Sequence, residues 1–425
     1  MKRIFGLAAI TGISAIASRG TLFVGALIYA RYLNPADFGS YSLIQTTALL
    51  FTTFFALNLG QMATKLVAEN MAGEKKKLGG AITISYSVGL GFSIVLGVLL
   101  VTVSFPLAKH VIGNEAQWTM VAASALLVFT GTLTSIQNGV ALGMQKVKAQ
   151  ALINIVTAPF LVALFFFSAR FERVDYALYS YIAAQVLICT GQQIFLSMSM
   201  KELGVRLSIK EVAKSDWKIV KTYGLPSSIA GLLTLPSQWI AMVFLARMES
   251  GPSELGIFSY ANQFRAIAMF AIGILANATL PHLTLLYKEK RNQDYQSQMN
   301  NALLVGVLLV MMMGVFMYPL SPYLIEILAP RYAAAHLPLV VLIFSCVPVV
   351  VTAVYMRSSS ARGNASEMVK TNAVFSIVLI VLAYSLRSMG ALGISIAFLV
   401  AATFQAFAAY FFETKKIKAY FLGAV

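Results

Sequence analysis

The stretch ARYLNPADFGSYS, residues 30–42, lies between two long apolar runs, and a close copy of it returns as ARMESGPSELGIFS, residues 246–259. Both copies contain Ala-Arg, Pro, an acidic residue, Gly, an aromatic residue and Ser in the same order, with a single one-residue insertion. Two unrelated tight turns would share some of these residues, because they are common in turns. The shared order instead favours an internal repeat that divides the chain into two matching halves.

The composition of the chain is that of a membrane protein. Of its 425 residues, 59% are hydrophobic and only 11% are charged, too few charges to cover a water-soluble protein of this size. Apolar runs of about 20 residues, enough to cross roughly 30 Å of hydrocarbon as a helix, recur along the whole sequence. The runs are continuous rather than alternating, so they predict helices and not the strands of a barrel. We expect an all-α polytopic membrane protein with twelve spans, at residues 4–30, 38–63, 80–104, 117–142, 150–169, 177–200, 219–246, 255–280, 301–320, 333–356, 367–386 and 390–412.

The basic residues indicate the orientation of the chain. The formal net charge of +16 would suit a nucleic-acid partner, but 23 of the 32 Lys and Arg residues lie on the side of the membrane that holds the N-terminus. Because cytoplasmic loops are rich in Lys and Arg, this asymmetry predicts that both termini are cytoplasmic and that no nucleic acid is bound.

Residues 1–18 mimic a signal peptide. Cleavage after them would leave too few residues before Arg31 for a membrane span, so we expect residues 1–18 to be retained.

The repeat predicts an N-terminal lobe at residues 1–200, a linker at 201–218 and a C-terminal lobe at 219–425, with six spans in each lobe. Because six is an even number, both lobes start on the same side of the membrane and are parallel copies. In the linker, Ser208 and Glu211 have the spacing of a capping box. We therefore expect a short amphipathic helix on the cytoplasmic surface, which serves as a plain linker or in regulation.

Each copy of the repeated motif predicts the start of a helix. Asn34 is expected to cap the second span, with Pro35 in its first turn and Asp37 facing the positive end of the helix dipole. The second copy is expected to use Gly251, Pro252 and Glu254 in the same way.

Several stretches resemble one family of membrane proteins. They are LIYARYLNPADFGSYSL with its copy, KTYGLPSSIAGLL at the start of the second half, LPHLTLLYKEKRNQDYQ after the eighth span and EILAPRYAAAHLPLVVLIF at the tenth. The chain resembles the polysaccharide-export flippases of O-antigen (Wzx) type, a branch of the multidrug/oligosaccharidyl-lipid/polysaccharide exporter superfamily, over essentially its whole length.

This resemblance implies a V-shaped pair of six-helix lobes around a central cavity, in the bacterial inner membrane. It implies a transporter rather than an enzyme, which moves an undecaprenyl-diphosphate-linked oligosaccharide from the cytoplasmic to the periplasmic leaflet by alternating access. The oligosaccharide would be a repeat unit of O-antigen, in lipopolysaccharide, or of another surface polysaccharide. Besides membrane lipids, a polysaccharide polymerase and glycosyltransferases are implied as partners. Similar lipid II flippases carry two additional helices, which are not among the spans expected here.

Two arginines lie inside predicted spans. Arg19 interrupts the first span and Arg265 the eighth, both near mid-depth. An arginine there costs on the order of 3 kcal/mol unless it faces water, a partner or a ligand. No Asp or Glu lies in the middle of any span, and the planar guanidinium suits phosphate oxygens, so both arginines are expected to bind the anionic head of the substrate. The alternative is that backbone carbonyls or amides between helices hold each arginine.

Amide side chains and two prolines complete the candidate site. The amides expected to line the cavity are Gln45, Gln238, Asn262 and Asn277. Hydrogen bonds between helices would also explain amides in apolar spans. Pro226 and Pro236 lie in the seventh span, where each is expected to kink the helix, as a hinge or as a static bend.

Two other classes of function stay open at this point. A multidrug or cation antiporter of the same superfamily would need membrane carboxylates, which the middles of the spans lack. A membrane glycan polymerase or ligase would need a sizeable periplasmic loop, and every predicted outer loop is short.

No GxxxxGK[ST] loop and no metal motif occur, so we expect no cofactor and no metal, with coupling to the membrane potential or an ion gradient. Cys189 and Cys346 fall within spans and are expected to be buried thiols.

Overall fold

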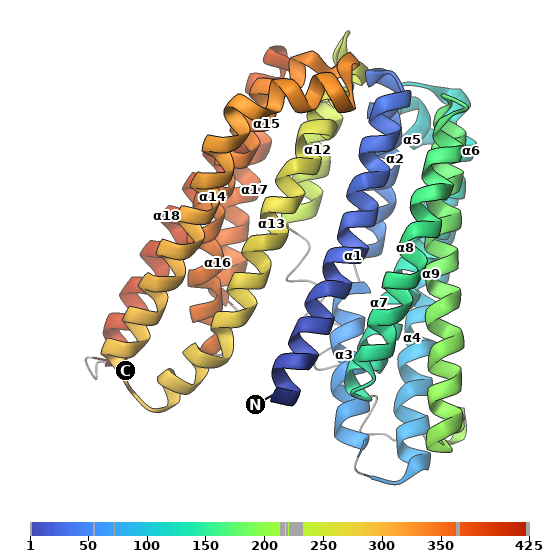
Figure 1. The fold of residues 1–425 in the computed structure, drawn as a ribbon, viewed down its shortest axis with the longest axis vertical. Helices are drawn as coiled ribbons and strands as arrows, with labels where there is room; N and C mark the ends of the chain where they lie inside the picture. The colour runs from blue at the N-terminus through green and yellow to red at the C-terminus, as the bar shows by residue number, and fades with distance from the viewer. Residues whose placement is uncertain are drawn as a thin grey trace. The chain divides into compact units, whose positions relative to one another are not determined.

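The computed structural model of the chain is helical (Figure 1), and it describes residues 2–53, 56–71, 73–212, 217, 220, 233–362 and 366–421. Within these residues the secondary structure consists of helices and turns, without strands. Each predicted span contains at least one helix, so the predicted all-α fold class is confirmed. Of the described segments, eight are long and apolar enough to cross a membrane, and one of these, Glu367–Thr414, covers two predicted spans. The number of twelve spans stays a prediction.

The residues divide into two compact units according to their internal contacts. The first unit consists of Met1–Leu33 and Ser40–Leu232, and the second of Asn34–Gly39 and Leu233–Val425. The short segment Asn34–Gly39, the middle of the first copy of the repeated motif, therefore packs with the C-terminal half of the chain. The predicted lobe boundaries at residues 200 and 218 stay a prediction.

The first unit is a bundle of long helices. Its elements are α1 (Lys2–Tyr32), most of α2 (Pro35–Thr53), α3 (Ala56–Asn70), α4 (Lys75–Thr102), α5 (Ser104–Leu107), η1 (Ala108–Ile112), η2 (Glu115–Gln117), α6 (Trp118–Ala123), α7 (Ala125–Gly143), α8 (Val147–Ala169), α9 (Val174–Leu203) and η3 (Ile209–Glu211). Helix α1 packs on α8, α3 and α4 pack on α7, and α9 packs on α7 and α8. Glycines permit the closest approaches, since a Cβ on Gly139 of α7 would overlap the carbonyl oxygen of Gly60 in α3.

The segment after α9 differs from the predicted linker helix. Helix α9 ends at Gly204, whose φ of 65° lies in the left-handed region that glycine adopts without strain. The predicted capping box is wrong, because the Ser208 side chain caps nothing and its backbone N–H donates to Thr83 Oγ1 at 3.0 Å. Residues 209–211 form only a short 3-10 helix. Beyond residue 212, Trp217 is the one residue of the predicted linker that lies within the described residues.

The second unit is also a helical bundle. Its elements are α12 (Thr234–Ala246), α13 (Gly251–Lys288), α14 (Asn292–Leu328), η5 (Pro330–Ala335), α15 (His336–Phe344), α16 (Cys346–Ala361), α17 (Ser366–Leu386), η6 (Arg387–Met389) and α18 (Gly390–Phe421). Helix α18 packs on α16 and α17, α13 packs on α14, α15 and α16, and α12 packs on α17. Apolar side chains fill the space between them, including Ala268, Val310 and Val350, all fully buried.

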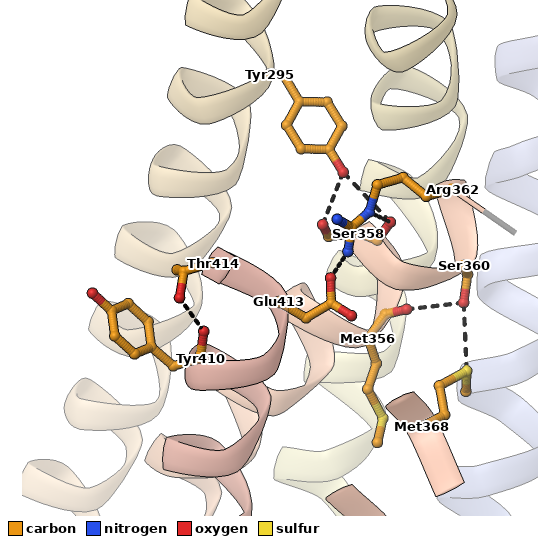
Figure 2. A network of polar contacts seen from close by, with 9 residues as sticks. All are labelled: Tyr295, Met356, Ser358, Ser360, Arg362, Met368, Tyr410, Glu413 and Thr414. Carbon is orange, nitrogen blue, oxygen red and sulfur yellow. Dashed lines mark hydrogen bonds and ion pairs between the residues drawn. The ribbon is translucent and has the colours of Figure 1, made fainter. Parts of the chain in front are cut away.

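A polar network holds three helices together at one end of this unit (Figure 2). Arg362, directly after α16, forms an ion pair with Glu413 of α18, and the two side chains are only 6% and 3% exposed. The Tyr295 hydroxyl of α14 lies 2.8 Å from Ser358 Oγ of α16. Burial lowers the pKa of the Arg362 guanidinium, which nevertheless stays charged because its intrinsic pKa is so high. The network therefore keeps a charged pair inside the protein, where it fixes α14, α16 and α18 to one another.

The two copies of the repeated motif start helices, as predicted, with one difference. In the first copy, Asn34 Oδ1 accepts the N–H of Asp37 at 2.8 Å, so the predicted cap is confirmed. In the second copy, the helix already begins at Gly251, with Ser250 before it, so the prediction of Gly251 as the cap is wrong by one residue. Glu254 does more than predicted, because its carboxylate accepts the backbone N–H of Ala391, at the start of α18, at 2.7 Å.

Within the second unit the two copies also contact each other. A Cβ added to Gly39 would overlap the carbonyl oxygen of Pro252, and a Cβ added to Gly256 would overlap the carbonyl oxygen of Pro35. The contact is reciprocal, since equivalent residues of the two copies exchange roles. It explains why both copies carry glycine four residues after proline: the helices approach so closely that no side chain fits.

Candidate functional site

One group of polar side chains lies in the first unit, and we call it the Tyr181 cluster. It consists of Arg19 from α1, Gln45 from α2, and Tyr181 and Gln185 from α9. Gln45 lies one turn after Tyr41 in α2 and Gln185 lies one turn after Tyr181 in α9, so both amides lie on the helix faces where these two rings meet, and the charge of Arg19 acts on the Tyr181 hydroxyl. Arg19 is exposed, whereas the other three side chains are half-buried. The cluster therefore combines a permanent cation with a hydroxyl and two amides on three helices.

Aromatic rings support the Tyr181 side chain from behind. The ring of Tyr41 in α2 meets it edge to face, with centroids 6.3 Å apart. Tyr29 of α1 packs on Tyr41 at 5.2 Å, and its hydroxyl lies 2.7 Å from Ser180 Oγ of α9. Tyr29 and Tyr41 are 1% and 3% exposed, so this support is part of the core. The position of the Tyr181 ring is thus set by packing between α1, α2 and α9.

The second unit holds the other predicted arginine in a closed environment. Arg265 of α13 is 7% exposed, and its guanidinium carbon lies 4.9 Å from the ring centre of Phe398 in α18. Its Nε donates to Ser345 Oγ at 3.3 Å, and Nη1 donates to Asn262 Oδ1 at 3.4 Å. Both bonds are longer than the usual 2.9–3.0 Å. Within the described residues Arg265 forms no ion pair with a carboxylate, so its charge is held by a ring and by weak hydrogen bonds.

The two groups occupy equivalent places in the repeat. The motif alignment makes Tyr41 equivalent to Phe258, and each ring packs on an aromatic ring of the last long helix of its unit, Tyr181 in α9 and Phe398 in α18. Four residues after the motif aromatic, an amide follows in both copies, Gln45 and Asn262. Each unit therefore brings together an arginine, an amide and an aromatic ring, although the arginine comes from α1 in the first unit and from α13 in the second.

The remaining predicted site residues lie elsewhere or outside the description. Gln238 is half-buried on α12 and joins neither group. Asn277 lies in α13, but its side chain lies outside the described part of the chain. Pro236 is the third residue of α12, where a helix has N–H groups without an intrahelical acceptor, so it costs no hydrogen bond there. Pro226 lies outside the described residues, and a hinge in the seventh span stays a prediction.

Sequence reasoning missed two members of the Tyr181 cluster. Tyr181 and Gln185 are four residues apart in the sixth predicted span, a spacing that places them on one face of a helix. That spacing was the available signal. It was weak because the same span also carries Gln192 and Gln193, which face other helices or the core.

Other chemistry-bearing residues lie apart from these groups. Cys189 and Cys346 are free, buried thiols, as predicted. In the part of the chain that the structure describes, no three His, Cys, Asp or Glu residues come together as a metal site would require. His336 Nδ1 lies 2.7 Å from Ser321 Oγ, a contact between η5–α15 and α14 that belongs to helix packing.

Two solved structures share the fold described above. A solved structure of an inward-facing multidrug resistance MATE family transporter of the MOP superfamily is similar with a TM-score of 0.79, at 14% identity, over 99% of this chain and 100% of that chain. The lipid II flippase MurJ in an inward closed conformation is similar with a TM-score of 0.74, at 14% identity, over 98% of this chain and 90% of that chain. At these identities the comparison establishes the shared fold.

Sequence comparison then establishes the family. Residues 7–287, more than half of the chain, match the family described as Polysaccharide biosynthesis protein, and the chain belongs to this family. The EPS I polysaccharide export inner membrane protein EpsE of Ralstonia nicotianae is 22% identical over 385 residues, 89% of this chain and 85% of that protein. Its namesake in Ralstonia solanacearum is 23% identical over 272 residues, 64% of this chain and only 61% of that protein. The resemblance to polysaccharide-export proteins is thereby confirmed.

Proposed function

We propose that this protein is a flippase for a surface-polysaccharide precursor. It moves an oligosaccharide linked to undecaprenyl diphosphate from the cytoplasmic to the periplasmic leaflet of the bacterial inner membrane. The family supports this function, as do the relatives named as polysaccharide export inner membrane proteins and the structural similarity to a lipid II flippase. Polymerases and glycosyltransferases that make and use the oligosaccharide are the functional partners that such a role requires.

The observation that carries the proposal is the state of the two arginines. Arg19 and Arg265 lie within long apolar helices, and within the described residues neither forms an ion pair with a carboxylate. Such a charge is costly in a membrane unless it meets water, a partner or a ligand, and a transported anion is the ligand that suits both arginines. A diphosphate offers oxygens in the planar arrangement that a guanidinium binds best. The substrate is therefore an anion, and its head is a phosphate ester.

The direction of transport follows from the charge of the substrate. The inside of a bacterial cell is electrically negative, so outward movement of an anionic head is favoured by about 2.3 kcal/mol per charge for each 100 mV. Binding in one conformation and release in the other requires that the two conformations hold the head with different affinity. Arg265 is closed in this structure, and its exposure in a second conformation would supply such a difference.

A multidrug antiporter is the rival that the shared fold allows, because a MATE family transporter has the same fold. A cationic drug needs a carboxylate to replace its lost hydration, whereas both groups described above are cationic. Expression in a drug-sensitive strain tests this rival. Increased resistance to organic cations, without any effect on surface polysaccharide, would replace the flippase proposal.

The proposal itself is tested by complementation of a strain from which the gene is deleted. Arg19→Ala and Arg265→Ala are expected to abolish surface polysaccharide and to accumulate the lipid-linked precursor, with normal amounts of protein in the membrane. Arg173→Ala is a matched control, since Arg173 is exposed and its described contacts are local, an ion pair with Asp175 and the ring of Tyr176. If both Arg19→Ala and Arg265→Ala restored surface polysaccharide fully, the anion-binding role would be wrong.

A further inference from the structure

Each unit ends its fifth predicted span with the same arrangement of aromatic rings. This span lies in α8 of the first unit and in α17 of the second, and each helix packs on the helix that leads into a copy of the repeated motif, α1 or α12. The ring of Phe166 in α8 meets that of Tyr32 in α1 edge to face, with centroids 6.2 Å apart. The ring of Tyr384 in α17 meets that of Phe244 in α12 in the same way at 5.5 Å. A second ring therefore holds the last aromatic ring of each span from the side.

An arginine lies on each of these two held rings. Arg170 directly follows α8, and its guanidinium carbon lies 4.7 Å from the ring centre of Phe166. Arg387 directly follows α17, and its guanidinium carbon lies 4.1 Å from the ring centre of Tyr384. The face of an aromatic ring attracts a cation, so both guanidinium groups are held in position. The same pairing of arginine and ring thus occurs at the same place in both units.

The depth of these arginines in the membrane identifies their surroundings. Each follows the last residue of a long apolar helix, where the hydrocarbon ends and the lipid headgroups begin. The distribution of basic residues predicts that this end of both helices is periplasmic, the side on which Lys and Arg are less common. Arg170 is exposed and Arg387 is half-buried, so the headgroups of surrounding lipids can reach both.

The charges of these two arginines are open to an external anion. Within the described residues neither Arg170 nor Arg387 forms an ion pair with a carboxylate, although Glu172 lies two residues after Arg170. Arg173 in the same turn shows the contrast, since it donates two hydrogen bonds to Asp175, at 3.0 and 2.7 Å. A guanidinium whose face lies on a ring keeps the N–H donors of its edge for acceptor oxygens, and phosphate oxygens match that planar edge.

Exposed apolar side chains flank both arginines. Phe167 and Phe171 are exposed beside Arg170, and Met389 is exposed beside Arg387. A free phosphate ion has no group that would contact these side chains. A phospholipid offers a phosphate to the arginine and its glycerol and acyl groups to the apolar side chains, so it matches both parts of the surface.

From these observations we infer that Arg170 and Arg387 each bind the headgroup phosphate of an anionic phospholipid in the periplasmic leaflet. The ring beneath each arginine fixes the guanidinium, and the flanking apolar side chains contact the upper part of the acyl chains. Phosphatidylglycerol suits both sites better than phosphatidylethanolamine, whose ammonium group an arginine repels. The inference goes beyond the proposed function, because it concerns resident lipids, one on each unit, and does not depend on the transported substrate.

The test measures lipid binding to the purified full-length protein. Native mass spectrometry in detergent gives the number and affinity of bound phosphatidylglycerol molecules. Diacylglycerol, which lacks the phosphate, and inorganic phosphate, which lacks the lipid, are the comparison probes. The variants are Arg170→Gln and Arg387→Gln, singly and together. Arg173→Gln is the matched control, because Asp175 already occupies the Arg173 guanidinium.

The wild-type protein is expected to bind two phosphatidylglycerol molecules more tightly than any others. Each single variant is expected to weaken one of these sites by about fivefold, the usual effect of one basic residue near a membrane surface, and the double variant both. Arg173→Gln is expected to keep both sites. Arg170→Lys keeps the charge without the planar edge and is expected to fall between the wild type and Arg170→Gln.

Three results would overturn the inference. If Arg170→Gln and Arg387→Gln bound phosphatidylglycerol as the wild type does, the arginines would serve only to pack the rings. If the variants lost affinity for diacylglycerol to the same extent, the contact would be with the acyl chains and not with the phosphate. If inorganic phosphate displaced the lipid, the sites would bind a free anion. Surface polysaccharide is not a readout of this test, so its outcome is separate from that of the proposed function.

Discussion

Gly39 and Gly256 are the residues at which the repeated motif tolerates least change. Each lies against a carbonyl oxygen of the other copy, so any side chain forces the two helices apart. We expect Gly256→Ala to destabilise the protein by about 1–3 kcal/mol, the usual cost of overpacking. The measurement is the midpoint of thermal unfolding in detergent, together with the amount of protein in the membrane.

The same helix offers the control for that substitution. Gly273 also lies in α13, but nothing lies within 4 Å of the place where its Cβ would be. Gly273→Ala is expected to leave stability unchanged or to raise it slightly, since alanine favours helices by about 1 kcal/mol over glycine. Equal midpoints for Gly256→Ala and Gly273→Ala would show that the reciprocal contact is looser than described.

Arg362 provides a second prediction at the residue scale. Arg362→Met leaves the Glu413 carboxylate buried without its partner, and removal of one member of a buried pair costs about 3–5 kcal/mol. The exposed pair of Lys109 and Glu115 is the control, because its side chains are 47% and 56% exposed. Lys109→Met is expected to cost less than about 1 kcal/mol.

Thermal unfolding again measures both variants. The double variant Arg362→Met with Glu413→Met is expected to recover much of the lost stability, since neither charge is then left alone. A loss for Arg362→Met no larger than that for Lys109→Met would mean that water reaches the network.

At the scale of elements, the start of α18 depends on a side chain from α13. Glu254 accepts the N–H of Ala391, next to Gly390, whose φ of 64° suits glycine. Glu254→Leu removes a hydrogen bond to a charged group, worth about 1.5–3 kcal/mol. We expect faster hydrogen exchange of the Ala391 amide and of the first turn of α18. Glu254→Gln keeps an acceptor oxygen and is expected to have a smaller effect, and Glu289→Leu, in an exposed turn, is expected to have none.

Element boundaries and site residues were predictable to different degrees. The helices followed from long apolar runs, and the cap at Asn34 followed from local chemistry, because its amide needs only residues within one turn. The capping box at Ser208 failed because its backbone N–H finds an acceptor in Thr83, far away in the sequence. Local patterns cannot reveal such a partner.

The same distinction applies to the candidate site. Arg19 and Gln45 were predicted because a charge or an amide in an apolar span is unusual by itself. Tyr181 is one of two tyrosines in its predicted span, and only the rotation of α9 brings its ring to Tyr41 of α2. Arg265 was predicted as a ligand-binding residue, and the structure adds that Ser345 and Phe398 enclose it.

At the scale of the whole molecule, the distribution of basic residues predicts the topology. Cys189 and Cys346 are buried and unpaired with each other, so replacing both by alanine gives a background for single-cysteine labelling. Lys109→Cys, on the predicted outer side, is expected to react with a membrane-impermeant maleimide in intact cells. Lys76→Cys, on the predicted cytoplasmic side, is expected to react only after permeabilisation. The opposite pattern would invert the predicted orientation of the chain and would contradict the proposed direction of transport.

The reciprocal contact between the two copies of the motif has the geometry of a symmetric homodimer, in which residue i of one subunit meets residue j of the other and j meets i. A true homodimer of half-length chains would have to repeat every feature, including the Tyr181 cluster, on both subunits. Two copies within one polypeptide are released from that constraint. One half can keep Tyr181 where the other has Phe398, so covalent fusion lets the two halves differ in chemistry while they keep the same packing at equivalent places.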